Sequence, residues 1–571
     1  MKSIFSRSGS PEPDPSGSGP SGPAPSGRGR SRPGGRRRLA LVAGITAGCA
    51  ALLTLTLWPE GSGTGNGAGA TPTPSPATTA DSRSPASAAA THPVSKPPLT
   101  IPAVREHEAA RGPGWHPDRG GQVIVAEDSA EELADEGRLI AQELGLTYAQ
   151  GAEPGKGDVE LALVSGESNT DADPEAYTIR VADERVRITA GDDAGVFYGT
   201  RTLKQAVRQG GTAPEGVIRD APAKPQRGFM LDIARKHFTA AWIEDRVREL
   251  ADLKYNQIGL HFSDDQAFRI ESSSHPEVVS PVHLKKSEVR QIIALARRLH
   301  IEVIPEIDSP GHLGAVLAAH PQLQLRDTRG NPARGAIDIS KPGSAKIVDE
   351  LLREYADLFP GTYWHLGADE YRALMVADPE ARYPQLAALA REKYGPDAKV
   401  QDLATGWVND RAKVVRAEDK KPKMWNDGMF AGGVVQADED LEVEYWTGKE
   451  LRAREPVEYL KAGRKLVNLN DEYLYYVLGE PNQFTYPTGE RIYKEWNPLV
   501  VRGSEPVPAT YDDQILGARF AVWCDFSTAQ TPGQVADGIR LPLRALAQRV
   551  WDERTPELPW GEFRALAEKL G

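Results

Sequence analysis

Short apolar segments alternate with helix-like segments from residue 227 to the end of the 571-residue chain. Eight of them have the length and composition of β-strands, and most are followed by a loop and helical material. They are residues 228–233, 257–262, 302–306, 363–367, 423–425, 442–445, 465–469 and 517–522. Strands that alternate with helices form parallel sheets, and eight such units favour a closed barrel. We therefore predict an α/β chain with a (β/α)8 TIM barrel over residues 223–571.

A smaller domain is expected before the barrel, over residues 101–222. Strand-like segments occur at residues 123–125, 160–164, 176–180 and 186–189, and helix-like segments at residues 130–144 and 193–209. Short apolar segments thus alternate with helix-like segments in this part of the chain. This pattern predicts a small α+β domain.

The first hundred residues differ in composition from the rest. Residues 1–38 are rich in Pro, Ser, Gly and Arg and are expected to form a disordered basic tail. Residues 39–58 carry no charge, and about 20 apolar residues in a helix span a bilayer. Residues 59–100, rich in Gly, Pro, Ser and Thr, are typical of a linker.

The apolar segment 39–58 follows Arg36, Arg37 and Arg38, which favours a cytoplasmic tail. The expectation is a single-pass protein of the cell membrane with an extracellular catalytic domain. Two alternatives stay open: a cleaved signal peptide, which would give a secreted protein, and a lipoprotein site at Cys49. The second is weaker, because the residues before Cys49 lack the usual leucine and apolar residues continue after it.

Charge and cysteine content exclude several classes of partner. The net charge is −12, and the basic tail carries +6, which leaves −18 on the rest of the chain. An acidic body argues against nucleic acid as a partner. The two cysteines, Cys49 and Cys524, are poorly placed for a disulfide, and no Cys/His or acidic run has zinc or EF-hand spacing. We expect no metal and no cofactor.

Charged and aromatic side chains follow the predicted strands, at the face where TIM barrels bind their substrates. Any one of them has a simpler interpretation, since an Asp after a strand is often a helix N-cap and a lone Trp or His is often a core residue. Their joint occurrence suits a sugar site, where aromatic faces contact C–H surfaces and charged groups bind hydroxyls. The candidates are Arg235, Asp264, His312, Asp369, Glu370, Trp425, Trp446, Tyr473, Tyr475, Trp523 and Asp525.

The adjacent pair Asp369-Glu370 is the most informative feature. A glycosidase that forms a covalent intermediate needs two carboxyls about 5 Å apart on opposite sides of the scissile bond. Neighbouring residues at one strand end suit another arrangement, in which one carboxyl is the acid and its neighbour steadies a nucleophile that belongs to the substrate. Metal binding by the pair is the alternative, although no histidine-rich partner set accompanies it.

Four ordered motifs resemble those of glycoside hydrolase family 20, the β-N-acetylhexosaminidases. They are Arg-Gly-Phe-Met-Leu-Asp-Ile-Ala-Arg (227–235), Leu-His-Phe-Ser-Asp-Asp-Gln (260–266), Val-Ile-Pro-Glu-Ile-Asp-Ser-Pro-Gly-His (303–312) and His-Leu-Gly-Ala-Asp-Glu (365–370). The resemblance extends over residues 120–555, and residues 176–205 are similar to the small domain that precedes the barrel in that family.

The resemblance implies a role for each candidate. Glu370 would be the general acid/base, and Asp369 would orient the 2-acetamido group as its oxygen attacks the anomeric carbon to form an oxazolinium ion. Tyr473 would hydrogen-bond the acetamido oxygen, and Asp264 and His312 would form a relay behind the acid/base. Arg235 would hold the sugar's 3- and 4-hydroxyls. The aromatic box would comprise Trp425, Trp446 and Trp523. Burial beside Asp369 is expected to raise the pKa of Glu370.

Two positions depart from the family pattern. Tyr475 stands where many members have Asp after Tyr-Leu, and Asp525 stands where many have Glu two residues after the last Trp. Both positions contact the 4- and 6-hydroxyls in the family, so the choice of sugar is open, and the pattern resembles the dispersin-like and lacto-N-biosidase-like branches.

Because Arg235 would close the pocket beyond the first sugar, we expect an exo-acting retaining enzyme that removes terminal β-linked GlcNAc or GalNAc from an oligosaccharide or polysaccharide. Release of a disaccharide, as by lacto-N-biosidases, and carbohydrate binding without catalysis are the alternatives.

Overall fold

The computed structural model describes residues 92–164, 174–450 and 453–571. The expected tail, the apolar segment 39–58 with Cys49, and most of the linker lie outside these residues. Within the described ranges, no helix is both long and apolar enough to cross a bilayer.

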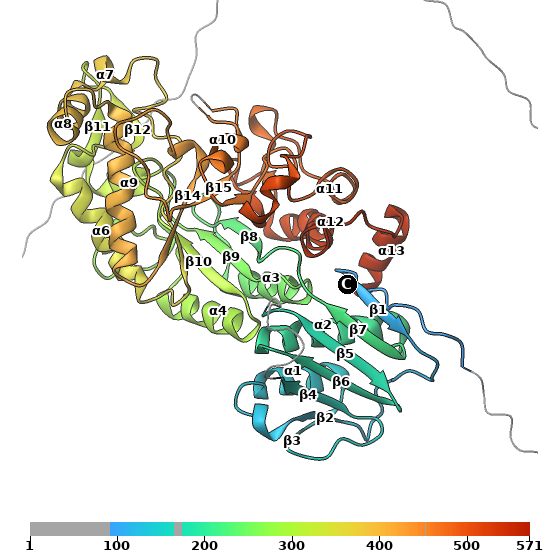
Figure 1. Ribbon diagram of the computed structural model, residues 1–571. Helices are drawn as coiled ribbons and strands as arrows, with labels where there is room; N and C mark the ends of the chain where they lie inside the picture. Colours follow the sequence, from blue (N-terminus) through green and yellow to red (C-terminus); the bar gives the residue numbers. More distant parts are fainter. Residues whose placement is uncertain (1–91, 165–173, 451–452) are drawn as a thin grey trace, which may run out of the picture. The chain divides into compact units, whose positions relative to one another are not determined.

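Eight parallel strands close into a barrel, as the sequence predicted (Figure 1). Each strand pairs with the next, and β18 pairs with both β16 and β8, which closes the barrel. The strands are β8 (Gln226–Asp232), β9 (Gln257–His261), β10 (Glu302–Glu306), β13 (Tyr363–His365), β14 (Lys421–Trp425), β15 (Glu442–Tyr445), β16 (Leu466–Asn468) and β18 (Ile515–Trp523). A short strand that the sequence did not predict, β17 (Tyr475–Val477), pairs parallel to β18.

Amphipathic helices cover the outside of the barrel. Helix α4 buries Val289, Ile292 and Ala296, which are spaced three and four residues apart, against the barrel. Its three arginines, Arg290, Arg297 and Arg298, are exposed. The longer helices are α3 (Ala240–Asp252), α4 (Lys286–Arg298), α6 (Pro342–Ala356), α9 (Val400–Arg416) and α12 (Pro532–Trp551). Shorter ones are α5 (Gly314–Ala319), α7 (Pro379–Arg382), α8 (Pro384–Tyr394), α10 (Pro456–Lys461), α11 (Gly489–Glu495) and α13 (Trp560–Leu570). Between β14 and β15, residues 426–441 contain only the 3-10 turn η4 (Asn426–Gly428).

Several charged side chains inside the barrel form ion pairs with one another. Arg519 of β18 contacts Glu444 at 3.0 Å, and Lys423 of β14 contacts the same carboxylate at 3.3 Å. Gly228 and Gly259 leave room for Arg519, because a Cβ at either position would lie within 2.9 Å of its side chain. Buried charges are tolerated when they are paired in this way.

The preceding domain is a seven-stranded mixed sheet with two helices, which agrees with the expected α+β class. Its strand order is β1-β7-β5-β6-β4-β2-β3. The sequence predicted β2 (Gln122–Val125), β4 (Val159–Leu163), β5 (Tyr177–Ala182), β6 (Arg185–Ala190), α1 (Ala134–Leu144) and α2 (Asp193–Gly210), but not β1 (Glu106–Ala109), β3 (Thr147–Gln150) or β7 (Gly216–Asp220). β1 and β3 are the two edge strands and have little buried surface, which explains their weak pattern.

A buried lysine joins the two domains. Lys254, in the turn after α3, is fully buried and donates to the Tyr177 hydroxyl at 2.7 Å. Its ammonium group lies 3.2 Å from the carboxylate of Asp220, which also accepts from the indole of Trp551. Burial lowers the pKa of Lys254 to about 8. Residues of the small domain and of the barrel thus complete one polar cluster.

Candidate active site

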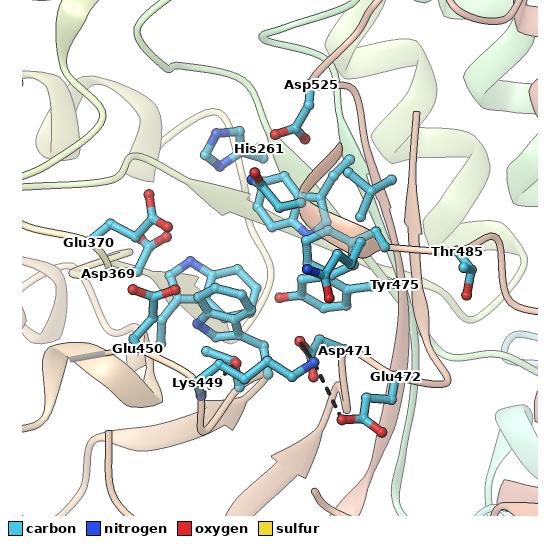
Figure 2. A pocket seen from close by; sticks show the side chains of 18 of the residues that line it. His261, Asp369, Glu370, Lys449, Glu450, Asp471, Glu472, Tyr475, Thr485 and Asp525 are labelled. Carbon is cyan, nitrogen blue, oxygen red and sulfur yellow. Dashed lines mark hydrogen bonds and ion pairs between the residues drawn. The ribbon is translucent and has the colours of Figure 1, made fainter. Parts of the chain in front are cut away.

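A pocket of about 720 Å³ opens at the C-terminal ends of the barrel strands (Figure 2). This is the face where TIM barrels carry their active sites. It contains nine of the eleven predicted site residues: Arg235, His312, Asp369, Glu370, Trp425, Trp446, Tyr475, Trp523 and Asp525. Asp264 and Tyr473 do not line it.

Asp369 and Glu370 lie in a tight turn after β13. Gly367, Ala368 and Glu370 all have positive φ, at 69°, 82° and 45°. A Cβ at Gly367 would overlap the carboxylate of Asp308, so only glycine fits there. Backbone conformations of this kind cost energy in non-glycine residues and are common where side chains must be aimed at a ligand.

Two carboxylates hold the backbone of this turn. The N–H of Ala368 donates to Asp308 at 2.8 Å, and the N–H of Glu370 donates to Asp427 at 3.0 Å. Asp308 follows β10 and Asp427 follows β14, so the two neighbouring strands position the pair. Neither residue was predicted as a site residue, although each lies two positions after a predicted strand.

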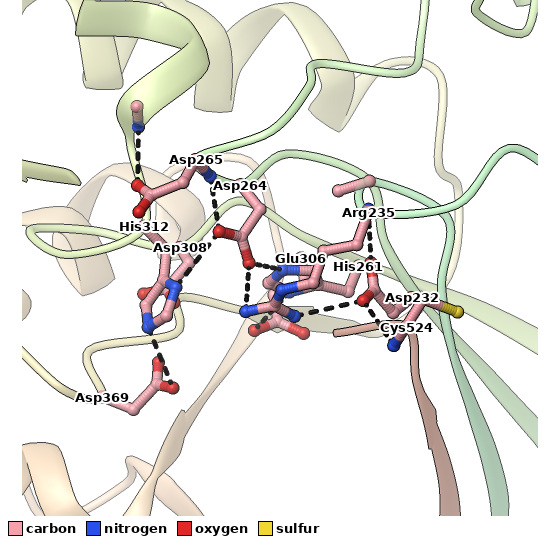
Figure 3. A network of polar contacts seen from close by, with 12 residues as sticks. Asp232, Arg235, His261, Asp264, Asp265, Glu306, Asp308, His312, Asp369 and Cys524 are labelled. Atoms are coloured by element: carbon pink, nitrogen blue, oxygen red, sulfur yellow. Dashed lines mark hydrogen bonds and ion pairs between the residues drawn. The ribbon is translucent and has the colours of Figure 1, made fainter. Parts of the chain in front are cut away.

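His312 lies between Asp264 and the acid pair, and Figure 3 shows its contacts with Asp264 and Asp369. Its Nδ1 lies 3.2 Å from Asp264, and its Nε2 lies 3.5 Å from Asp369 and 3.6 Å from Glu370. Asp264 also accepts from Arg235 at 2.7 Å and from His261 at 2.8 Å. A buried carboxylate surrounded by three nitrogen donors stays ionised and fixes the orientation of each donor.

The protonation states of the acids differ from the expectation for Glu370. Its pKa is lowered, chiefly by the hydrogen bond from His312, so the predicted increase is wrong. Burial and the neighbouring Asp308 instead raise the pKa of Asp369 well above its usual range. Burial also raises the pKa of Asp308 to about 7, and burial together with Asp369 raises that of Asp427 to about 8.

The cause of this reversal is His312. Burial lowers the pKa of His312, but the carboxylates of Asp264 and Asp369 outweigh it and raise the pKa well above its usual range. The imidazolium cation stabilises the ionised form of Glu370. We therefore expect His312 to carry the proton that Glu370 lacks, and Asp369 and Asp308 to share another.

Four aromatic rings enclose the pocket beside Asp369. Trp446 stacks on Tyr475, with ring centroids 5.6 Å apart and planes 5° from parallel, and Trp523 lies 5.9 Å from Trp425. The indole of Trp425 donates to Glu306, and that of Trp446 donates to Asp427, each at 2.8–2.9 Å. These bonds fix the orientation of both indoles.

Arg235 forms another part of the wall. Its guanidinium contacts Asp232 at 3.1 Å and Asp264 at 2.7 Å, and its Cζ lies 5.2 Å from the centre of the Trp523 ring. Asp525 also lines the pocket. Burial raises the pKa of this carboxyl above its usual value, although the nearby Arg235 opposes the shift. Arg235 is held in place before any ligand binds.

Tyr473 and Tyr475 have different environments. Tyr473 is buried outside the pocket, where Arg491 covers its ring at 4.0 Å and its hydroxyl lies 3.5 Å from Glu495. Tyr475 begins β17 and lies across the pocket from the acid pair (Figure 2). The tyrosine available to a bound sugar is therefore Tyr475, and the role expected for Tyr473 does not fit its position.

The outer part of the pocket has residues that the sequence analysis missed. Lys449 and Glu450 come from the loop after β15, and Asp471 and Glu472 from the loop after β16; residues 482–485 and Arg491 complete this part. Lys449 contacts Asp471 at 2.8 Å and Glu472 at 3.4 Å. Except for Arg491 in α11, these residues lie in loops and short turns with no recurring pattern, so only the position of Asp471 after a strand indicated a site.

Asp308, His312 and Asp369 also offer ligand-type atoms within 4.8 Å of one another. A cation there would have to displace the proton that the two aspartates share and the imidazolium proton of His312. The geometry thus allows a divalent ion but does not require one.

Carboxylates at the C-terminal face of a barrel, next to aromatic walls, are typical of glycoside hydrolases, and the pocket has that chemistry. The family model described as "Glycosyl hydrolase family 20, catalytic domain" matches residues 225–554, and the model for domain 2 of that family matches residues 98–221. The chain belongs to glycosyl hydrolase family 20, the β-N-acetylhexosaminidase family.

Two curated relatives are a lacto-N-biosidase of Bifidobacterium bifidum and a beta-hexosaminidase of Porphyromonas gingivalis. The first is 30% identical over 502 residues, which are 86% of this chain and 43% of the relative. The second is 26% identical over 449 residues, which are 70% of this chain and 54% of the relative. The chain thus spans about half the length of these relatives. A solved exo β-N-acetylglucosaminidase of Vibrio harveyi, in complex with N-acetylglucosamine, has the same fold, with a TM-score of 0.67 at 23% identity over 83% of this chain and 77% of that one.

Proposed function

We propose that the protein is a retaining exo-β-N-acetylhexosaminidase that removes a terminal β-linked GlcNAc or GalNAc with the substrate's acetamido group as nucleophile. The observation that carries this proposal is the position of Asp369. It lies beside Glu370 at one strand end and faces an enclosure of three tryptophans and Tyr475. An acetamido group in that enclosure would have its N–H on Asp369, its methyl against indole rings and its oxygen near the Tyr475 hydroxyl.

The first chemical step breaks the glycosidic bond. The proton held by His312 passes through Glu370 to the leaving oxygen, while the acetamido oxygen attacks the anomeric carbon and forms the cyclic oxazolinium. The positive charge that develops on this ring stabilises the ionised form of Asp369, whose proton is otherwise favoured by burial. The aromatic enclosure keeps water away from the cation until the leaving group has departed.

The second step is hydrolysis of the oxazolinium. Glu370 accepts a proton from a water molecule as its oxygen attacks the anomeric carbon from the side that the leaving group vacated. The ring opens, the acetamido group is restored, and the product keeps the β configuration. Glu370 then passes this proton to His312, whose imidazolium form the Asp264 carboxylate stabilises, and the starting state is restored.

The fixed position of Arg235 supports release of a monosaccharide. Its two ion pairs and its contact with Trp523 hold the guanidinium where the far end of the first sugar would lie. Disaccharide release is the second candidate, favoured by the 30% identity to a lacto-N-biosidase and by the Tyr475 and Asp525 substitutions.

Comparison of two aryl glycosides tests both. The p-nitrophenyl β-GlcNAc substrate is expected to be hydrolysed, a thiazoline mimic of the oxazolinium is expected to inhibit, and NMR is expected to detect the β-anomer first. Hydrolysis of the aryl lacto-N-bioside alone would establish the second candidate. Glycan binding without turnover of any β-HexNAc glycoside would refute both and indicate a carbohydrate-binding protein.

We also propose that residues 39–58 anchor the protein in the cell membrane with the barrel outside the cell. The support is the charge-free segment after three arginines. The full chain is expected in the membrane fraction after carbonate washing, and a variant without residues 39–58 in the soluble fraction. Full-length chain in the medium would indicate a cleaved signal and a secreted enzyme.

A further inference from the structure

A second cluster of titratable side chains lies away from the pocket. His275 precedes the 3-10 turn η2 (Pro276–Val278), Glu277 lies within it, and His320 lies between α5 and the 3-10 turn η3 (Pro321–Leu323). The Glu277 carboxylate lies 2.9 Å from Nδ1 of His275 and 2.9 Å from Nε2 of His320. None of the three residues lines the active-site pocket.

We propose that His275, Glu277 and His320 bind a divalent transition-metal ion such as Zn²⁺. All three ligand-type atoms lie within 4.8 Å of one another, and tetrahedral zinc with ligand bonds of about 2 Å needs atoms slightly more than 3 Å apart. Small rotations of the side chains would therefore admit the ion. Two imidazoles and one carboxylate suit Zn²⁺, whereas Ca²⁺ and Mg²⁺ prefer oxygen ligands.

The surroundings of His275 support this inference independently. Its second ring nitrogen, Nε2, lies 3.1 Å from a carboxylate oxygen of Glu350 in α6. A metal-binding histidine usually donates its other N–H to a carboxylate in this manner, which fixes the tautomer and turns the free nitrogen toward the ion. Two carboxylates near the cluster would also balance the charge of a divalent ion.

Access and burial are consistent with such a site. The side chains of His275 and His320 are 13% and 22% exposed, while that of Glu277 is 44% exposed. The imidazoles are therefore held by their packing, and an ion can reach them from solvent. The spacing of these residues in the sequence did not indicate a metal site, because His320 is 45 positions from His275 and only the fold brings the two side chains together.

An ion at this place would connect two loops that serve the active site. The loop after β9 carries Asp264 and continues to His275, and the loop after β10 carries His312 and continues through α5 to His320. The metal would be structural, because its ligands do not reach the pocket. The proposal does not depend on the substrate.

Zinc titration of the full chain tests this site. The protein is purified without a histidine tag, treated with a chelator and dialysed, and then titrated with ZnCl₂ by calorimetry. One saturable Zn²⁺ site per chain and a higher Tm with Zn²⁺ are expected, whereas Mg²⁺ should have neither effect. His320→Gln and Glu277→Gln are expected to weaken Zn²⁺ binding by about tenfold or more.

The matched control is His283→Gln, because His283 belongs to the same loop but its Nδ1 donates to the backbone carbonyl of Ser280. This variant should bind Zn²⁺ as the unmodified protein does. The visible absorption bands of bound Co²⁺ provide a second readout. We expect these bands to be lost in His320→Gln and to be present in His283→Gln. Absence of saturable Zn²⁺ binding, or unchanged affinity in folded His320→Gln and Glu277→Gln, would overturn the proposal.

Discussion

Replacement of Asp264 by asparagine tests the polar network behind the acid pair. The Asp264 carboxylate is 1% exposed and lies within 2.7–3.2 Å of Arg235, His261 and His312. An amide has no charge and must turn its NH2 group toward one of these donors. Hydrogen bonds to a charged group contribute about 1.5–3 kcal/mol each, and removal of one partner from a buried charged cluster costs about 3–5 kcal/mol. We expect Asp264→Asn to lower the free energy of unfolding by about 3–5 kcal/mol.

The loss should depend on pH. The pKa of Asp264 is lowered below 3.8, so its contribution is present above that value and disappears as the pH falls through the lower, folded pKa. The pKa of His312 is raised above 6.5, so its contribution is complete below 6.5 and disappears as the pH rises through the higher, folded pKa. The difference in stability between the unmodified protein and Asp264→Asn should therefore be largest between pH 3.8 and 6.5.

Urea denaturation at several pH values, with the aryl glycoside activity measured in parallel, provides the assay. The matched control is Asp265→Asn, since Asp265 pairs with Arg334, a largely exposed residue, and such pairs contribute about 0–1 kcal/mol. A variant Asp264→Asn that is no less stable than Asp265→Asn, or a difference between them that does not change with pH, would refute the role given to the buried Asp264 carboxylate.

Three further predictions concern the pocket and its surroundings. Asp369→Asn removes the carboxylate that stabilises the oxazolinium cation, and Glu370→Gln removes the general acid, so each is expected to lower kcat at least about a hundredfold. A near-normal kcat in either variant would contradict the role assigned to that residue. Tyr475→Phe is expected to lower kcat/KM about tenfold through one lost hydrogen bond, whereas Tyr473→Phe should change it little; the opposite order would return the role to Tyr473. Cys524 is fully buried, and burial raises the pKa of its thiol. Iodoacetamide should therefore modify Cys524 only after unfolding, which mass spectrometry can measure. Rapid labelling of Cys524 in the native protein would show that the last barrel strand opens.

The barrel could be predicted because its strands are buried on both faces and appear as continuous apolar segments in the sequence. β8 is buried at every position, and its predicted and observed bounds differ by two residues at the start and one at the end. β17 could not be predicted, because it has three residues and its aromatic side chains serve the pocket and the core together. β7 was missed for another reason, because it begins at a glycine with positive φ, and glycine in a sequence usually indicates a turn.

The site residues that the sequence predicted follow a barrel strand or belong to one of the four family motifs. Tyr473 and Tyr475 are two positions apart, so a continuous strand would point both to the same side. Tyr473 instead lies in the turn before β17, and the turn directs its ring toward Arg491. The pKa direction of Glu370 was wrong for a related reason. The like charge of Asp369 is visible in the sequence, whereas the contact with His312 depends on where two loops meet.

The buried contact between Lys254, Asp220 and Tyr177 has a consequence for how the two domains can be separated. A cut between residues 221 and 225 would divide the chain at the boundary between the two matched family domains. Each fragment would then expose half of an ion pair that is fully buried in the intact chain, with no partner to compensate it. We therefore expect the separated barrel to be less stable than the intact chain, and an exchange of catalytic domains among such enzymes to succeed best when the small sheet is transferred with the barrel.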